Sequence, residues 1–394
     1  MSDPVSNEPS LFRDQARDWI NTHFPSRLAW TVPAAAGVAL TEDQLSWRAA
    51  MGAKGWGVPT WPAAYGGGGL SEAQAAILAQ ELAQVGAYNP IGGMGIMMFG
   101  PTLLEYGTEA QKLEHIPRIA KAEVQWCQGF SEPGAGSDLA SLQCKAEDKG
   151  DHFVISGQKI WTSGAQYADW CFCLVRTDTS KKHEGISFVL FPMDQPGIDV
   201  RPISLIAGNS PFCEMFFTDV KAAKKDLVGP LNAGWTIAKR LLQFERSSIS
   251  GRDAFVGAHL PQLARDYVGS DETGRLADHD LRTRIIRLEM QAHALKLTAA
   301  RSRLEATGNE GPSATTSIMK NVGSSVMQMR AELALEILGN RGLGWNGDGF
   351  TSTELGLVRG WLGGKAASIY GGSQEIQSNI VSKRILGLPD PARA

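Results

Sequence analysis

The chain has 394 residues, and at about 150 residues per domain this length predicts two or three domains. Its 38 Lys and Arg residues and 41 Asp and Glu residues give a formal net charge of −3, and 43% of the residues are hydrophobic. This balance fits a globular protein and excludes the basic surface that nucleic-acid binding requires. A local basic pocket for a phosphorylated small molecule remains compatible with it.

The N-terminus has no basic segment followed by an apolar run, so no secretory signal is expected. The most apolar stretch, residues 91–99, is far shorter than the ~20 residues that a membrane-spanning helix needs. The five cysteines include no Cys-x-x-Cys pair and predict neither a disulfide framework nor a zinc site. Cys171 and Cys173 should share one face of a strand. These features predict buried thiols and a cytoplasmic protein.

The first third of the chain has a helical composition. Residues 71–85 are rich in Ala, Leu, Glu and Gln, and Ser71 can cap a helix there. A loop rich in Gly and Pro precedes this segment at residues 61–69, and a second helix is predicted from 109 to about 120. We therefore predict an N-terminal helical domain over residues 1–122.

The pattern changes near residue 123 to short β-type runs between turns, namely residues 152–156, 170–175, 185–191 and 213–217. Because no helical segments separate these runs, they predict an antiparallel sheet or barrel over residues 123–235.

Helical periodicity returns after about Gly234, where apolar residues step by three and four in two series. These are Leu281, Ile285, Leu288, Ala292, Leu295 and Ala299, and then Ile318, Val322, Val326, Met329, Leu333 and Ile337. Gly339 is a plausible stop for the second helix. We predict a C-terminal helical bundle over residues 236–394, and an α+β multidomain protein overall.

Two segments of the predicted β domain contain candidate chemistry. Residues 130–138 read Phe-Ser-Glu-Pro-Gly-Ala-Gly-Ser-Asp, and residues 157–164 read Gly-Gln-Lys-Ile-Trp-Thr-Ser-Gly. Taken alone, the first favours a tight turn, and Trp161 favours a core or interface position. However, glycines also let backbone amides approach a flat or phosphorylated ligand. Trp161, followed by hydroxyl side chains, can stack on an aromatic cofactor.

With two further motifs, these segments resemble the acyl-CoA dehydrogenase family over nearly the whole chain. The further motifs are Trp-Pro-x-x-Tyr-Gly-Gly at residues 61–67 and Tyr-Gly-Gly-Ser-Gln-Glu-Ile-Gln at residues 370–377. The resemblance implies the acyl-CoA dehydrogenase fold, with an N-terminal helical domain, a central antiparallel β-barrel and a C-terminal four-helix bundle.

The resemblance also implies FAD, which carries the redox chemistry while protein groups orient and tune it. In relatives, the loop that matches 130–137 lines the flavin and the thioester, and the hydroxyl that matches Ser163 lies near flavin N5. The implied cofactor contacts are Phe130, Ser131, Ser137, Trp161, Thr162, Ser163, Ser373 and Glu375.

A departure from the family pattern indicates which residue is the catalytic base. In many relatives a Glu follows the Tyr of the C-terminal motif, but here that position is Gly371. Isovaleryl- and long-chain-type relatives instead place the Glu on the first long helix of the bundle, before an Arg, and residues 242–246 read Leu-Gln-Phe-Glu-Arg. We therefore predict Glu245, beside Arg246, as the base; the alternative is an exposed helical Glu. The backbone N–H of Gly371 would still stabilise the enolate oxygen.

A second departure concerns the flavin diphosphate. Homotetrameric relatives hold it with the Arg of an Arg-x-x-Phe-Gly motif from a neighbouring subunit, and the matching residues 270–274 read Ser-Asp-Glu-Thr-Gly. Either a paralogous subunit supplies the Arg, or a local cation such as Arg275 substitutes for it. The first alternative resembles the larger subunits of paired steroid side-chain or pimeloyl-type dehydrogenases and favours a hetero-oligomer over a homo-oligomer.

The activity that the resemblance implies is the α,β-dehydrogenation of an acyl-CoA to a trans-2-enoyl-CoA in lipid or steroid catabolism, with electrons passing to an electron-transfer flavoprotein. The alternatives are a structural subunit that completes a partner's FAD site, and a flavin oxidase on the same fold. The seven histidines form no His-x-x-His or Glu-x-x-His pair, so no metal site is predicted.

Overall fold

The computed structural model of the chain describes residues 8–31, 33–34, 37–208, 210–251, 259–305 and 315–389, with the backbone alone described for residues 8, 246–251, 303–305 and 315–316. The chain divides into two compact units. The first comprises Met1–Pro202 and Pro211–Leu241, and the second comprises Ile203–Ser210 and Leu242–Ala394.

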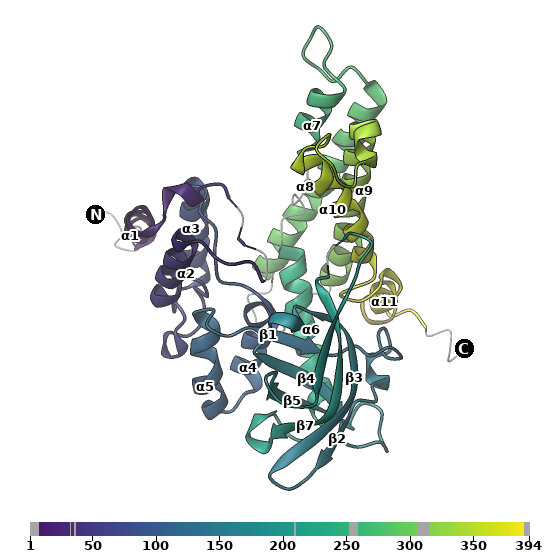
Figure 1. Cartoon of the computed structure of the whole chain (residues 1–394). Coiled ribbons are helices and arrows are strands. Elements are labelled where there is room, and N and C mark those ends of the chain that lie inside the picture. The colour runs from purple at the N-terminus through teal and green to yellow at the C-terminus, as the bar shows by residue number, and fades with distance from the viewer. Residues whose placement is uncertain are drawn as a thin grey trace. The chain divides into compact units, whose positions relative to one another are not determined.

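The first unit begins with helices (Figure 1): α1 (Glu8–His23), α2 (Glu42–Lys54), α3 (Glu72–Gln84), α4 (Gly100–Tyr106) and α5 (Glu109–Ala120). Helices α2, α3 and α5 each start at a capping box, in which the side chains of Thr41, Ser71 and Thr108 accept a backbone N–H three residues on. The two helices predicted here, and the cap at Ser71, are confirmed. Trp47 and Met51 are fully buried where α1, α2 and α3 meet.

The rest of the first unit is an eight-stranded sheet with the order β6-β7-β3-β2-β4-β5-β8, in which β1 also pairs with β4. The strands are β1 (Trp126–Gly129), β2 (Lys145–Asp148), β3 (His152–Ser163), β4 (Trp170–Arg176), β5 (Ile186–Pro192), β6 (Ile198–Ile203), β7 (Phe212–Ala223) and β8 (Leu227–Val228).

The sheet corrects the expected antiparallel barrel in two respects. The pairings β1–β4 and β2–β4 are parallel. After β1 the chain first forms the β2–β3 hairpin, and β4 then runs alongside β1 in the same direction. Among the described strands the hydrogen-bonded path ends at β6 and at β8 and does not close. Runs of β-type residues indicate strands but not their partners, so sequence periodicity gave no signal for either feature.

All five cysteines are free and buried in the sheet part of the first unit, as predicted. Cys171 and Cys173 lie on β4 and pack in the same cluster of buried side chains. Burial raises the pKa of both thiols well above its usual range, so they behave as inert apolar groups.

The second unit is helical. Helix α6 (Gly234–Gly251) enters it at Leu242, and α7 (Leu260–Tyr267), α8 (His279–Glu305), α9 (Thr315–Leu338), α10 (Ser352–Gly364) and α11 (Gln374–Ile380) follow. Helix α9 contacts α7, α8, α10 and α11, and Figure 1 shows α8, α9 and α10 running side by side. The two long helices predicted in this part are confirmed. Within the described ranges, no helix has both the length and the apolar character to cross a membrane.

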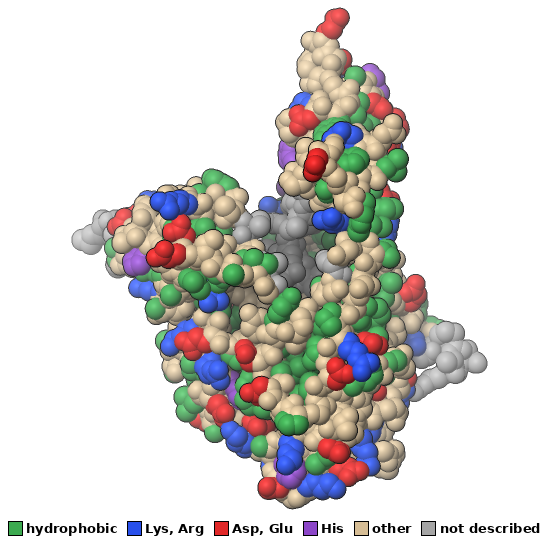
Figure 2. Space-filling view, in the orientation of Figure 1, with side chains coloured by type: hydrophobic (Ala, Val, Ile, Leu, Met, Phe, Trp, Pro, Cys, Tyr) green, Lys and Arg blue, Asp and Glu red, His purple; other side chains and the backbone are tan. Residues whose placement is uncertain are grey.

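Charged side chains of both signs are interspersed over the face of the molecule seen in Figure 2. No broad basic patch appears on the described part of that face. The mixed charges on this face agree with the small net charge.

A buried ion pair joins the two candidate segments of the first unit. Lys159 on β3 is 0% exposed, and its Nζ lies 2.7 Å from Oε1 of Glu132, which is 9% exposed. Lys159 also donates to the carbonyl of Phe130 at 3.0 Å. The Glu132 carboxylate accepts the backbone N–H groups of Gln143 and Cys144 at 2.6 and 2.9 Å. With these bonds, the loop after β1 is fixed against the strand that presents Trp161.

Replacing Lys159 by Met should destabilise the protein, because the Glu132 carboxylate would stay buried without its counter-charge. Breaking a buried pair in this way costs about 3–5 kcal/mol. The free energy of unfolding from urea titration measures the loss. The matched control is Lys145→Met, which breaks a 2.6 Å pair with Glu147 whose side chains are 60% and 44% exposed. Such an exposed pair should contribute only about 0–1 kcal/mol. Equal losses in the two variants would contradict a structural role for the buried pair.

Candidate functional site

Trp161 combines an uncommon backbone conformation with an exposed aromatic side chain, as Trp30 also does in this unit. Its φ is 61°, in the left-handed region that large L-residues rarely adopt, and its side chain is 54% exposed. The register between β3 and β7 shifts between Lys159 and Thr162, so Trp161 lies in a β-bulge. Bulges and strained backbone at an exposed aromatic are typical of ligand sites, where they aim a side chain.

Two hydroxyl residues follow Trp161. Thr162 is 1% exposed, and its Oγ1 has no hydrogen-bond partner among the described residues. Ser163 is half-buried and pairs with Phe212 of β7, whose ring meets Trp161 edge to face at 6.2 Å. A buried polar atom without a partner is costly, so a ligand atom or water is expected beside Thr162. This combination fits a flat cofactor whose ring carries hydrogen-bonding atoms.

The loop at residues 130–138 lies beside this strand, since the backbone N–H of Ile160 donates to the carbonyl of Ser131 at 2.9 Å. Ser131 is half-buried and Ser137 is exposed. A Cβ added at Gly134 or at Gly136 would meet no atom within 4 Å. Crowding therefore does not explain these glycines, and they leave the backbone open to a ligand.

Phe130 differs from its neighbours in this loop. Its side chain is 4% exposed and packs edge to face on Phe172 and Phe188, each at 6.0 Å between ring centroids. A cofactor contact at this position would therefore come from the backbone. From the sequence alone, a Phe at this position could equally pack in the core or contact a cofactor.

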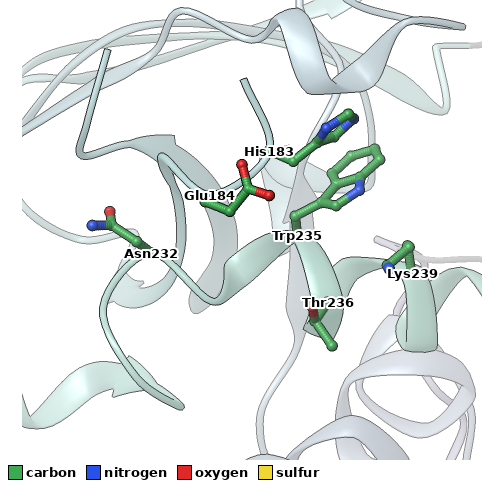
Figure 3. Close-up of a pocket in the computed structure, with 6 residues that line it drawn as sticks. All are labelled: His183, Glu184, Asn232, Trp235, Thr236 and Lys239. Carbon is green, nitrogen blue, oxygen red and sulfur yellow. The ribbon is translucent and has the colours of Figure 1, made fainter. Parts of the chain in front are cut away.

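A separate pocket of about 240 Å³ lies where the loop before β5 meets the start of α6 (Figure 3). The His183 and Trp235 rings lie 5.1 Å apart at 39°, and Lys239 follows one turn along α6. The remaining lining residues are Glu184, Asn232 and Thr236. Aromatic rings next to a cation suit an aromatic, phosphorylated group. Sequence analysis did not identify this pocket because its residues come from separate segments.

In the second unit, the C-terminal motif forms the start of α11. Gly371 has a φ of 66° and its carbonyl accepts Nε2 of Gln377 at 2.9 Å. Ser373 is the N-cap, accepting the N–H of Ile376 at 3.4 Å. Its hydroxyl also lowers the pKa of the exposed Glu375 carboxyl through a hydrogen bond. The three predicted site residues of this motif are thus held together on one turn.

Lys320 of α9 was missed by sequence analysis, since a single Lys in a helix normally indicates a solvated face. It is 4% exposed, and its Nζ has no hydrogen-bond partner within the described ranges. Burial lowers its pKa, and the charge of Glu375 opposes that shift. Asn321 next to it reaches the carbonyl of Gln374 at 3.5 Å, so α9 and the motif are in contact.

The predicted base, Glu245, lies half-buried on α6 in the second unit. Arg246 follows it on the same helix, and the Arg246 side chain lies outside the described part of the structure.

The acidic loop at residues 270–274, which stands where relatives have the diphosphate motif, is held by hydrogen bonds within itself. Asp271 accepts the Thr273 hydroxyl at 2.6 Å and the N–H of Arg275 at 3.0 Å. Its carboxylate thus organises the turn, and the Arg275 side chain is exposed.

Comparison with known proteins matches three domain models of one protein family to the chain. The models of the acyl-CoA dehydrogenase N-terminal, middle and C-terminal domains match residues 6–123, 127–220 and 232–386. The sequence is 36% identical to acyl-CoA dehydrogenase IpdE1 of Mycobacterium tuberculosis, over 97% of this chain and 98% of that protein.

Solved structures give the same result. The Tcur3481-Tcur3483 steroid ACAD superposes with a TM-score of 0.78 at 28% identity, covering 98% of this chain and 99% of that chain. The ChsE4-ChsE5 complex from Mycobacterium tuberculosis gives 0.74 at 29% identity, over 99% of both chains. The chain therefore belongs to the acyl-CoA dehydrogenase family, oxidoreductases that act on CH–CH bonds.

Proposed function

We propose that the chain dehydrogenates an acyl-CoA thioester between Cα and Cβ to give the trans-2-enoyl-CoA, using FAD. The observation that supports this most directly is the exposed Trp161 in a left-handed conformation, followed by the orphaned hydroxyl of Thr162. When bound, FAD supplies the acceptor for the hydride from Cβ, and an electron-transfer flavoprotein is the proposed next acceptor.

The proposed cofactor contacts fit a flavin chemically. Trp161 offers an aromatic face, and Thr162 and Ser163 offer hydroxyl groups to ring atoms. Ser131, Ser137 and the Phe130 backbone belong to the open loop that the Lys159–Glu132 pair fixes. In the C-terminal motif, Ser373 and Glu375 add polar contacts on the turn that contains Gly371.

In this proposal Glu245 removes the α-proton of the thioester, with Arg246 beside it. A carboxylate is a weak base toward a carbon acid, so the developing enolate oxygen must be stabilised as the proton leaves. The backbone N–H of Gly371 is the proposed donor. The absence of a side chain at Gly371 removes the base that many relatives use there, and Glu245 takes over that function.

The pocket beside His183 is proposed to receive the adenosine phosphate end of CoA. Its volume of about 240 Å³ is below the roughly 300–1,000 Å³ of whole-ligand pockets, so it would hold one part of a long ligand. Trp235 and His183 would stack on a base, while Lys239 would pair with phosphate.

A partner subunit is also proposed. On α8, Ile286, Met290 and Leu297 are 51%, 67% and 58% exposed and recur at helical spacing, which gives an apolar stripe. Such stripes usually mark interaction surfaces. The acidic loop at 270–274 lacks the cation expected at a flavin diphosphate, which favours a paralogous chain as the occupant. The structural relatives include the Tcur3481-Tcur3483 steroid ACAD, which favours a steroid-type acyl group, and the ChsE4-ChsE5 complex.

Glu245→Gln should retain FAD and lose flavin reduction by acyl-CoA, because the amide cannot accept the α-proton. Removal of a general base slows such steps by about 100- to 10,000-fold. Stopped-flow absorbance under anaerobic conditions measures the rate. Glu336→Gln, on an exposed Glu of α9 that pairs with Arg284, is the control and should react normally. Normal reduction by Glu245→Gln would disprove the base assignment.

Lys239→Ala should raise KM for acyl-CoA about tenfold, as expected when one charged hydrogen bond is lost. The KM for the matching acyl-pantetheine, which has no adenosine phosphate, should not change. Lys221→Ala, at an exposed residue of β7, serves as the control. Equal effects of Lys239→Ala on the two thioesters would refute the pocket assignment.

Met290→Asp should reduce the mass of the purified complex, because a charge within the α8 stripe would have to be desolvated at the interface. Light scattering after gel filtration measures this mass. Leu113→Asp, at a residue of α5 that is 56% exposed, should leave it unchanged. An unaltered mass for Met290→Asp would show that the stripe is not an interface, and a complex of identical chains would replace the paralogous partner.

A further inference from the structure

A cluster of three potential metal ligands lies in the first unit and shares no residue with the His183 pocket. Glu114 and His115 are adjacent on α5, and Asp226 ends the 3-10 turn (Lys224–Asp226) before β8. One ligand atom from each lies within 4.8 Å of the other two. Neither the proposed flavin site nor the proposed CoA pocket uses any of these residues.

Two of these side chains are buried with unused polar atoms. His115 is 1% exposed and Asp226 is 4% exposed. The His115 Nε2 and the Asp226 Oδ1 both lack a hydrogen-bond partner in the described part of the chain. Unpartnered buried atoms of this kind are rare in a stable protein, because each costs the loss of its hydration. An atom between them that binds both would remove that cost.

The surroundings hold the two side chains in place. The His115 ring meets Trp126 and Trp170 edge to face, at 5.2 and 4.9 Å between ring centroids. One turn earlier on α5, Gln111 Nε2 donates to the carbonyls of residues 225 and 227, at 2.7 and 2.9 Å. These bonds tie α5 to the backbone on both sides of Asp226. The ligands are thus prearranged by packing that does not itself need a metal.

We propose that Glu114, His115 and Asp226 bind a divalent transition-metal cation, for which Zn²⁺ is the best match. Zn²⁺ accepts both imidazole and carboxylate ligands, and an exposed rim at Glu114 leaves a position for water. The site would cross-link α5 to the segment that leads into α6.

Lys225 competes for this site. Its Nζ lies 3.0 Å from both carboxylate oxygens of Glu114, and the side chains of this pair are 64% and 41% exposed. An exposed ion pair of this kind is weak, so a divalent cation can displace the ammonium group. Removing the charge of Lys225 should therefore strengthen metal binding, whereas removing a ligand should weaken it.

The test measures Zn²⁺ retained by the purified protein after chelation, reloading and desalting, together with the Zn²⁺-dependent shift in Tm. Wild type should retain one equivalent and gain Tm. Asp226→Asn keeps the shape of the side chain but should lose at least about a hundredfold in affinity, since even outer-shell partners contribute about 10–100-fold. His115→Gln should behave similarly, and Lys225→Met should bind more tightly than wild type.

His152→Gln is the matched control, because this His pairs at 2.7 Å with the largely exposed Asp151. It should bind Zn²⁺ like wild type. Wild type without retained metal would overturn the proposal and indicate a bridging water between His115 and Asp226. Equal binding in wild type and Asp226→Asn would also overturn it. If His115→Gln fails to fold, the opposite effects of Asp226→Asn and Lys225→Met still decide. FAD content and flavin reduction are separate readouts, so failure here leaves the proposed dehydrogenase activity untouched.

Discussion

The buried pair of Lys159 and Glu132 is the interaction on which the candidate flavin-binding surface depends. Lys159 comes from the strand that presents Trp161, and Glu132 comes from the Gly-rich loop after β1. Two further backbone N–H groups satisfy the carboxylate, so the charges are compensated without water. Because the pair is buried, separating the loop from the strand would cost free energy. A ligand that lies against both would therefore meet a preorganised wall.

Polar atoms that the described protein leaves unsatisfied give a second, independent indication of where ligands bind. Thr162, whose hydroxyl has no partner, follows the exposed Trp161 in the chain, and the Lys320 ammonium feels the charge of Glu375. The His115 and Asp226 atoms form a third place of this kind. Folded proteins satisfy nearly all buried polar groups, so each exception calls for a partner. For Thr162 and for the His115 cluster, the surrounding residues suit partners of quite different chemistry.

Much of the fold could be predicted from the sequence, because local rules decide it. Helical composition places α3 and α5, with a capping signal at Ser71 for α3, and the apolar periods of residues 281–299 and 318–337 place α8 and α9. The strand predicted at residues 152–156 was too short, because β3 continues through the Gly-Gln-Lys segment to Ser163. Gly157 is needed there because a Cβ would lie 2.8 Å from Cys144 Cα. Such a contact between distant segments has no local signature.

The candidate site could be predicted only as a set of motifs. The motifs place Trp161, Ser373 and Glu375 in recognisable segments, but they give no sign that Lys159 is buried or that Phe130 belongs to the core. Burial depends on partners far away in the chain, and a Lys is normally solvated. Likewise, the parallel pairing of β1 with β4 follows from the path of the chain around the β2–β3 hairpin and not from either strand's own sequence.

The flavin-binding claim is tested most directly by the visible absorption spectrum of the purified protein, expressed alone and together with the paralogous subunit proposed as its partner. The account predicts flavin absorption, with bound FAD near one equivalent per site only when the partner chain is present. Stoichiometric flavin in the chain alone would contradict the shared site while keeping the dehydrogenase. Colourless protein in both preparations would contradict the central claim that Trp161 and its neighbours form a flavin-binding surface.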